Sequence, residues 1–217
     1  MHATTIAEYV QFVQEAADFV LEKLGPAKIA LVLGSGLGPF VDYLTETKEV
    51  DFRDIPHVPM TTVEGHKGKL ILGTVSGKRI LCLAGRIHPY EGHHMYELTF
   101  MVRIMRRVGV ELYVTTNSSG GCQPGMKQGC IMAIRDHMNW FHRNPLLEVP
   151  DLGERHVDMR RVYSSRLLTV ARRTAKAESV QLFEGTSVTT CGPTYESFAE
   201  VKGGTHRLCV LFVCLSL

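Results

Sequence analysis

The segment 85–92 gathers four side chains suited to binding an anion and a sugar. Arg86, His88, Tyr90 and Glu91 place a guanidinium, an imidazole, a phenol and a carboxylate directly after an apolar stretch. An arginine can grip phosphate with two N–H groups, and a histidine can donate a further hydrogen bond. Glu91 can orient or charge His88, and Tyr90 offers a flat face and a hydroxyl to a sugar. The alternative is a surface loop with a solvated ion pair, but four such groups together favour a functional loop.

A glycine-rich segment, 34–38, follows another apolar run and is a second candidate for anion binding. Its glycines let backbone N–H groups approach an anion, and Ser35 adds a hydroxyl donor. If a helix began here, its N-terminus would add a favourable dipole. Pro39 stands where a dinucleotide fingerprint needs its third glycine, and no Gly-Lys-Ser/Thr follows as in a Walker loop. Taken alone, the segment is better interpreted as a tight turn.

Three further segments carry groups that could meet a ligand. His66 lies in a short turn, where most histidines are merely exposed. Ser118 belongs to a run of small residues at a strand end, which could pass beneath a ligand or cap a helix. Tyr195 could stack on a base and Glu196 could accept from its ring N–H groups. The alternative for this last segment is a helix start, with Pro193 and Glu196 in the first turn.

The elements that must position these groups follow from hydrophobic spacing. Residues 5–24 are spaced as an amphipathic helix, with Thr5 and Glu8 as a capping box. Strands that stop at Gly/Ser-rich loops, with helices between them, indicate an α/β sheet whose site lies at the strand carboxyl ends. The expected strands are 29–33, 70–75, 79–84, 112–116, 131–134 and 182–190, and the other expected helices are 96–108 and 163–177.

Composition limits the class of protein. The 217 residues suit a single α/β domain, and a net charge of +2 without a long basic block argues against a nucleic-acid surface. The longest apolar run, 208–217, is about half of a membrane span. The N-terminus lacks the features of a signal peptide, and the six cysteines form no disulfide or zinc-ligand pattern. We therefore expect a cytoplasmic protein with reduced thiols, and no membrane or nucleic-acid partner.

The order and spacing of these segments resemble the trimeric purine nucleoside phosphorylases, from about the first helix to about Glu200. The motifs that carry the resemblance are 34–38, 64–68, 85–92, 116–121, 135–139 and 192–196. The resemblance implies an α/β fold with a mixed, partly barrel-like central sheet flanked by helices. It implies a nucleoside phosphorylase domain over 1–202, followed by a divergent tail over 203–217.

The resemblance also implies an activity: phosphate-dependent cleavage of inosine or guanosine to the free purine and ribose 1-phosphate, in a homotrimer. Inorganic phosphate is a co-substrate, and no metal or organic cofactor is expected. The catalytic residues implied are His88, Glu196 and His66. The phosphate-binding residues implied are Ser35, Arg86, His88 and the backbone N–H of Ser118. The ribose-binding residues implied are Tyr90 and His156, and the base-binding residues are Tyr195, Glu196 and Ser118.

Three departures from the family pattern shape the alternatives. The loop 139–145 is shorter than usual, and His156 stands where the family usually has a phenylalanine that reaches the neighbouring subunit. Family members also continue beyond this chain and supply further ribose and purine contacts, so we expect the C-terminal part of the fold to be missing. The alternative is therefore a catalytically impaired chain that only binds phosphate or poisons trimers. Methylthioadenosine phosphorolysis fits Glu196 less well, and Pro39 disfavours a dinucleotide-binding oxidoreductase.

Overall fold

The computed structural model describes residues 5–59, 68–148, 155–205 and 210–212. These residues form two compact units. The first unit holds the described residues of Met1–Asn117 and of Asn144–Gly153, and the second holds those of Ser118–Arg143 and Glu154–Leu215. We describe each unit by itself. Within the described residues, the helices are all too short or too polar to cross a membrane.

The first unit is built on a five-stranded mixed sheet of order β2-β3-β4-β1-β5. The strands are β1 (Ile29–Leu33), β2 (Thr45–Asp51), β3 (Lys69–Val75), β4 (Lys78–Ala84) and β5 (Leu112–Thr115). Strand β1 is parallel to both of its neighbours, β4 and β5, whereas β2, β3 and β4 form an antiparallel meander. The apolar sequence of β1 fits a parallel strand covered on both faces.

Helix α1 (Ile6–Lys23) forms as the spacing of its apolar residues predicts. Thr5 Oγ1 accepts from the backbone nitrogen of Glu8 at 3.2 Å, and Glu8 Oε2 accepts from that of Thr5 at 3.0 Å. This capping box satisfies two backbone N–H groups that the first turn leaves without partners. The predicted helix, capping box and strand 29–33 are confirmed.

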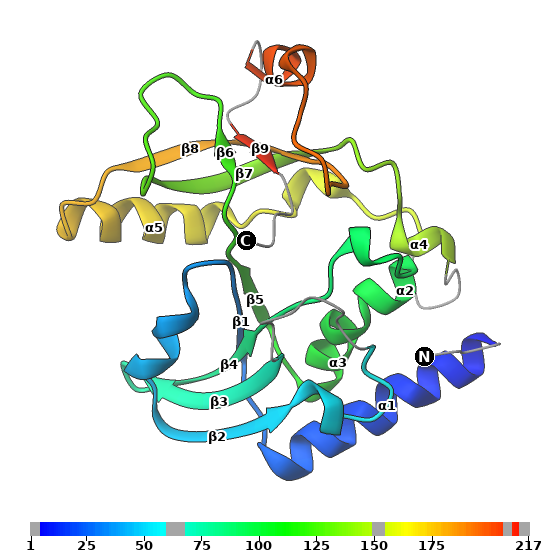
Figure 1. Ribbon diagram of the computed structural model, residues 1–217. Helices are drawn as coiled ribbons and strands as arrows, with labels where there is room; N and C mark the ends of the chain where they lie inside the picture. Colours follow the sequence, from blue (N-terminus) through cyan, green and yellow to red (C-terminus); the bar gives the residue numbers. More distant parts are fainter. Residues whose placement is uncertain (1–4, 60–67, 149–154, 206–209, 213–217) are drawn as a thin grey trace. The chain divides into compact units, whose positions relative to one another are not determined.

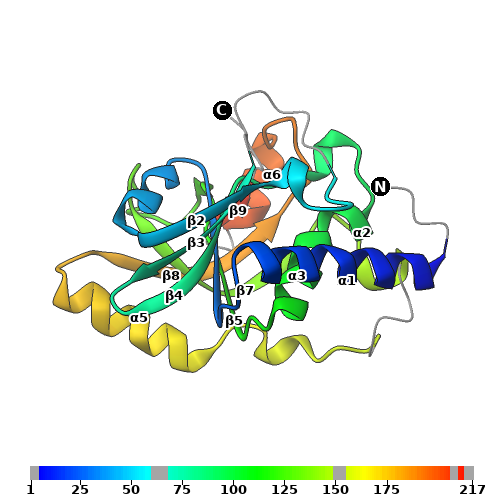
Figure 2. The ribbon, with the colours of Figure 1, turned by 90° about the horizontal axis from the view of Figure 1, so that it is seen from below.

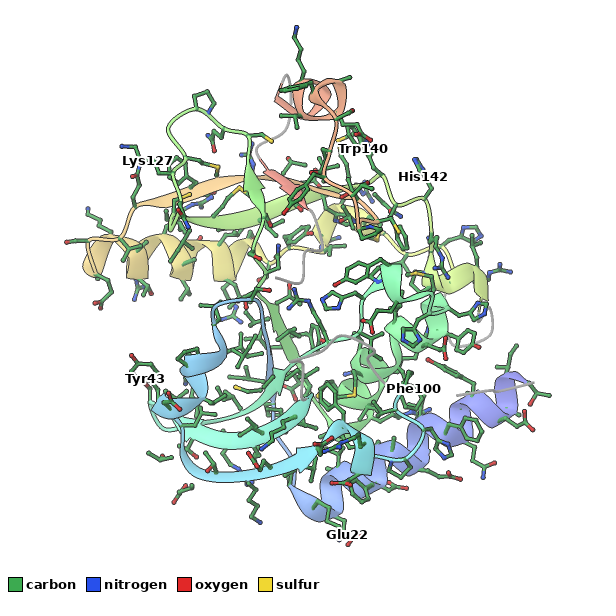
Figure 3. All side chains as sticks on the ribbon, in the orientation of Figure 1. Glu22, Tyr43, Phe100, Lys127, Trp140 and His142 are labelled. Carbon is green, nitrogen blue, oxygen red and sulfur yellow. The ribbon has the colours of Figure 1, made fainter. Side chains whose placement is uncertain are left out.

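The core of the first unit lies on both faces of its sheet. On one face α1 and α3 (Phe100–Val108) lie side by side, as Figures 1 and 2 show, and cover the alternate residues Ala30 and Val32 of β1. Phe100, labelled in Figure 3, is fully buried there and meets Tyr9 edge to face at 5.8 Å between ring centroids. On the other face, the 3₁₀ helix Gly38–Tyr43 packs against Leu33 and Leu44.

The second unit is built on a four-stranded sheet of order β6-β9-β8-β7. Its strands are β6 (Gly120–Gly121), β7 (Ile131–Asn139), β8 (Leu182–Thr189) and β9 (Val210–Phe212). Its helices are α5 (Ser165–Ala177) and α6 (Phe198–Thr205), and α5 runs along the sheet in Figure 1. The small core is formed by fully buried Val188 with Cys122 and Trp140.

The expected fold class is confirmed as a mixed α/β fold with mixed sheets flanked by helices, and among the described strands neither sheet closes into a barrel. The prediction of a short strand at 131–134 was wrong in length. Strand β7 has nine residues and continues through a register shift after Ile134. The helix expected over 96–108 divides at Thr99 into α2 (Met95–Leu98) and α3. A further short helix, α4 (Pro145–Glu148), contacts α2.

Candidate active site

Three of the predicted site loops leave the same edge of the five-stranded sheet. Strands β4, β1 and β5 are parallel neighbours, with Leu33 paired to Ala84 and Val32 paired to Thr115. The segments that follow them, beginning at Gly34, Gly85 and Thr116, therefore start side by side. The carboxyl edge of parallel strands is the usual ligand site of open α/β sheets. These three loops therefore lie at the sheet edge where the sequence places the site, and the site itself stays a prediction.

Gly34 is required by the close approach of β1 to the segment after β5. A Cβ atom at position 34 would lie 2.5 Å from Asn117 Cα and 2.6 Å from the carbonyl oxygen of Thr116. Beyond it, the backbone nitrogen of Leu37 donates to the carbonyl oxygen of Gly34 at 3.0 Å, which closes a turn around Ser35. The turn leads into the 3₁₀ helix Gly38–Tyr43 and not into an α-helix. The loop therefore does not gain the favourable electrostatic potential that the N-terminus of an α-helix would give to a bound anion.

Arg86 is held against the end of β1. Its Nη1 donates to the carbonyl oxygen of Leu33 at 3.4 Å, and the side chain is half-buried. Gly85 reaches φ +123°, and a Cβ there would lie 2.9 Å from Gly68 Cα, so this bend requires glycine. The bend directs the chain from β4 into the loop. The structure therefore brings the Arg86 guanidinium to the strand end that opens the Gly34–Ser35 turn.

His88 is fully buried, and Glu91 is its charged neighbour. Glu91 Oε1 accepts from the backbone nitrogen of His88 at 2.7 Å and lies 3.2 Å from its Nδ1. The side chains of His88 and Glu91 are 0% and 1% exposed. Tyr90 stacks on the imidazole with 5.0 Å between ring centroids and 13° between planes. A buried imidazole with one edge fixed by a carboxylate is oriented for hydrogen bonding to an anion.

The predicted base residues Tyr195 and Glu196 belong to the second unit, in the segment that follows β8. Thr190 Oγ1 donates to Glu196 Oε1 at 3.0 Å, which orients the half-buried carboxylate. Tyr195 is 70% exposed and so is accessible to a flat ligand. The alternative of a helix beginning at Pro193 was wrong, because α6 begins at Phe198 with a Ser197–Glu200 cap.

The remaining predicted residues are dispersed. Ser118 is exposed and directly follows Asn117, where the chain passes from the first unit to the second. His156 is exposed in the second unit, shortly before the 3₁₀ helix Met159–Arg161. His66 lies outside the described residues. The structure thus gathers Ser35, Arg86, His88 and Tyr90 in the first unit, while Ser118, His156, Tyr195 and Glu196 belong to the second.

Thr116 is a site-adjacent residue to which the sequence assigned no role. Its Oγ1 accepts from the backbone nitrogen of Gly34 at 2.9 Å and donates to the carbonyl oxygen of Val32 at 2.7 Å. The sequence signals at this position were a hydroxyl residue at the end of an apolar strand and its place in the motif 116–121. The hydroxyl signal is weak, since threonine is common in strands for reasons of packing.

Comparison with known proteins agrees with this geometry. The family model of the phosphorylase superfamily matches residues 28–209. The chain is 39% identical over 193 residues to purine nucleoside phosphorylase 1 of Bacillus subtilis, covering 88% of this chain and 71% of that protein. It is 38% identical over 182 residues to the purine nucleoside phosphorylase of Bos taurus, covering 81% of this chain and 63% of that protein.

Solved structures are similar over nearly the whole chain. Isoform 2 of the purine nucleoside phosphorylase from Schistosoma mansoni, in complex with cytosine and ribose-1-phosphate, has a TM-score of 0.84 and 31% identity, covering 93% of this chain and 74% of that one. A schistosoma purine nucleoside phosphorylase in complex with hypoxanthine has a TM-score of 0.86 and 26% identity, covering 94% and 75%. The chain therefore belongs to the phosphorylase superfamily and, within it, to the purine nucleoside phosphorylases.

Proposed function

We propose that this chain catalyses the phosphate-dependent cleavage of 6-oxopurine nucleosides such as inosine and guanosine. An oxygen of inorganic phosphate forms a bond to the anomeric carbon, and the bond from that carbon to the purine nitrogen breaks. The purine leaves with the bonding electron pair and takes up a proton, and ribose 1-phosphate is the second product. The observation that carries the proposal is the placement of Arg86 at the end of β1, directly before the Gly34–Ser35 turn, in the same loop as the buried His88–Glu91 pair.

Phosphate binding is assigned to Ser35, Arg86 and His88, with the backbone N–H of Ser118. The guanidinium offers paired N–H donors to phosphate oxygens, and the imidazole held by Glu91 offers another. Holding phosphate beneath the sugar supplies the nucleophile in place. It also sets negative charge beside the cation that develops at the anomeric carbon.

We assign the ribose to Tyr90 and His156, and we assign to His66 a role near the phosphate and the sugar 5′ end. Glu196 and Tyr195 are assigned to the base, together with Ser118. A carboxylate oriented by Thr190 can accept the ring N–H that a 6-oxopurine carries and adenine lacks. Contacts that strengthen as the purine gains negative charge lower the barrier and do not merely improve binding. Glu196, His88 and His66 are therefore the proposed catalytic side chains.

The proposal includes a cytoplasmic homotrimer in which inorganic phosphate is the co-substrate and no metal or organic cofactor takes part. An active enzyme is favoured over a chain that only binds phosphate, because relatives that are 39% identical over the aligned residues are named as purine nucleoside phosphorylases. Methylthioadenosine is disfavoured as a substrate because the ring nitrogen beside its 6-amino group carries no N–H for the Glu196 carboxylate to accept.

The experiment that tests the proposal is hypoxanthine release from inosine by the purified chain, measured with and without added phosphate. The proposal predicts release that saturates with phosphate and is lost when phosphate is removed. Release at the same rate without phosphate would identify a hydrolase. No release from a folded protein that still binds phosphate would support the non-catalytic alternative.

A further inference from the structure

We propose that Thr116 is a positioning residue of the phosphate site: its hydroxyl fixes the first peptide group of the Gly34–Ser35 turn. This inference rests on the proposed phosphate site and adds to it a residue that touches neither phosphate nor nucleoside. The proposed role depends on two hydrogen bonds that one hydroxyl group makes.

The Thr116 hydroxyl acts as donor and acceptor at once. It donates to the carbonyl oxygen of Val32 at 2.7 Å and accepts from the backbone nitrogen of Gly34 at 2.9 Å. Both distances are typical of well-formed hydrogen bonds of their types, and a hydroxyl has the one donor and the lone pairs that this arrangement needs. The side chain therefore continues the pairing of β1 with β5 past the last paired residues, Val32 and Thr115.

The two bonds differ in how much they depend on the hydroxyl. The carbonyl oxygen of Val32 also accepts from the backbone nitrogen of Thr116 at 3.1 Å, so it keeps a partner when the hydroxyl is removed. The backbone nitrogen of Gly34 has Thr116 Oγ1 as its acceptor. Gly34 is buried, and a buried N–H without a partner carries a desolvation cost. Removal of the hydroxyl therefore leaves the backbone N–H of Gly34, the residue that opens the turn, without this acceptor.

The position of Gly34 matters because the end of β1 is fixed from both sides. On the β4 side, Arg86 Nη1 donates to the carbonyl oxygen of Leu33, and on the β5 side Thr116 holds Gly34. The peptide groups that precede Ser35 are thus anchored to both neighbouring strands. A binding group that is misplaced by a fraction of an ångström loses affinity even when its own contacts are chemically unchanged.

The test compares substitutions that remove the hydroxyl with one that keeps it. Thr116→Val retains the branched shape of threonine, Thr116→Ala removes the hydroxyl without adding bulk, and Thr116→Ser keeps the hydroxyl. Thr115→Val is the matched control, because Thr115 is the exposed last residue of β5 and directly precedes Thr116. Phosphate affinity of each purified variant is measured by titration calorimetry, and KM is measured for phosphate and for inosine.

The expected result is phosphate affinity about tenfold weaker in Thr116→Val and Thr116→Ala, which corresponds to about 1.4 kcal/mol. The KM for inosine changes less than twofold, and Thr116→Ser and Thr115→Val stay within twofold of the unmodified chain. A purely structural role would lower the melting temperature and leave phosphate affinity unchanged, which would overturn the inference. If the unmodified chain binds no phosphate, the proposed phosphate site fails and this inference fails with it.

Discussion

Glu91 and His88 form a buried pair in which one carboxylate oxygen serves two donors of the same residue. Glu91 Oε1 lies 2.7 Å from the backbone nitrogen of His88 and 3.2 Å from its Nδ1. The backbone bond fixes the turn of the loop, and the ring bond fixes the rotation of the imidazole. The geometry of the loop and the orientation of a proposed phosphate ligand therefore depend on one side chain.

Replacement of Glu91 by glutamine tests this coupling. The amide oxygen can still accept from the backbone nitrogen, but the negative charge beside the imidazole is lost. We expect the KM for phosphate to rise about tenfold, in line with the loss of one hydrogen bond to a charged group, while the KM for inosine stays within twofold. Glu97→Gln is the matched control, since Glu97 forms a similar pair with the backbone nitrogen of His94 at 2.9 Å. Equal effects of both substitutions on phosphate would contradict a special role for Glu91.

Arg86→Ala is expected to weaken phosphate binding about 10- to 100-fold, because charged hydrogen bonds contribute about 1.5–3 kcal/mol. Binding of hypoxanthine alone should change little, and calorimetric titration with each ligand separates the two effects. Arg107→Ala provides the control, as Arg107 is exposed in the last turn of α3. Equal losses for phosphate and base would remove Arg86 from the phosphate site.

Glu196→Gln is expected to harm 6-oxopurine substrates selectively. The substitution exchanges a carboxylate acceptor for an amide that can also donate, which favours a 6-aminopurine relative to a 6-oxopurine. The kcat/KM ratio of inosine to adenosine should fall by about tenfold or more. Glu200→Gln serves as control, because Glu200 instead caps α6 by accepting from the backbone nitrogen of Ser197 at 2.7 Å. An unchanged ratio would place the base elsewhere.

The buried Tyr9 and the half-buried Tyr113 predict how the stability of the protein changes in alkali. Burial raises the pKa of Tyr9 to about 12 and that of Tyr113 to about 12. In the unfolded chain a tyrosine ionises near about pH 10, so the folded state binds more protons between these values. The contribution of these two tyrosines to the free energy of unfolding should therefore be constant below about pH 10 and fall as the pH rises towards about 12.

Urea unfolding at several pH values measures this fall. Tyr113→Phe should reduce its slope, whereas Tyr43→Phe should leave the slope unchanged, because Tyr43 is 74% exposed and lies on the surface in Figure 3. A slope that is the same in both variants would show that Tyr113 is ionised as easily in the folded state as in the unfolded chain.

Elements with a strong local pattern could be predicted from the sequence, and those made by distant pairing could not. Helix α1 has both apolar spacing and its own cap, and β1 is a short apolar run. Strand β2 is largely exposed, with the sequence TETKEVD, and it forms because its backbone pairs with β3 at the sheet edge. Strand β6 has two glycines and pairs with β9, which lies far along the chain. Neither strand carries a hydrophobic signal.

The candidate site shows the same division. The side chains of the loop 85–92 indicated anion binding. The expected strands, which end at Gly/Ser-rich loops, indicated that the site lies at the carboxyl edge of the sheet. The complete burial of His88 could not be predicted, because a histidine in a loop that also carries Arg86 and Glu91 resembles a surface residue until Glu91 is seen to accept its N–H groups. The hydrogen bonds of Thr116 to Val32 and Gly34 likewise required the parallel register of β1 and β5.

The central claim is that phosphate itself enters the product. Its most direct test follows inosine and inorganic phosphate by phosphorus NMR in the presence of the purified chain, with hypoxanthine measured in parallel. The account predicts that the phosphate signal is replaced by that of ribose 1-phosphate, with one phosphate consumed for each hypoxanthine released. Hypoxanthine release with the phosphate signal unchanged would contradict it.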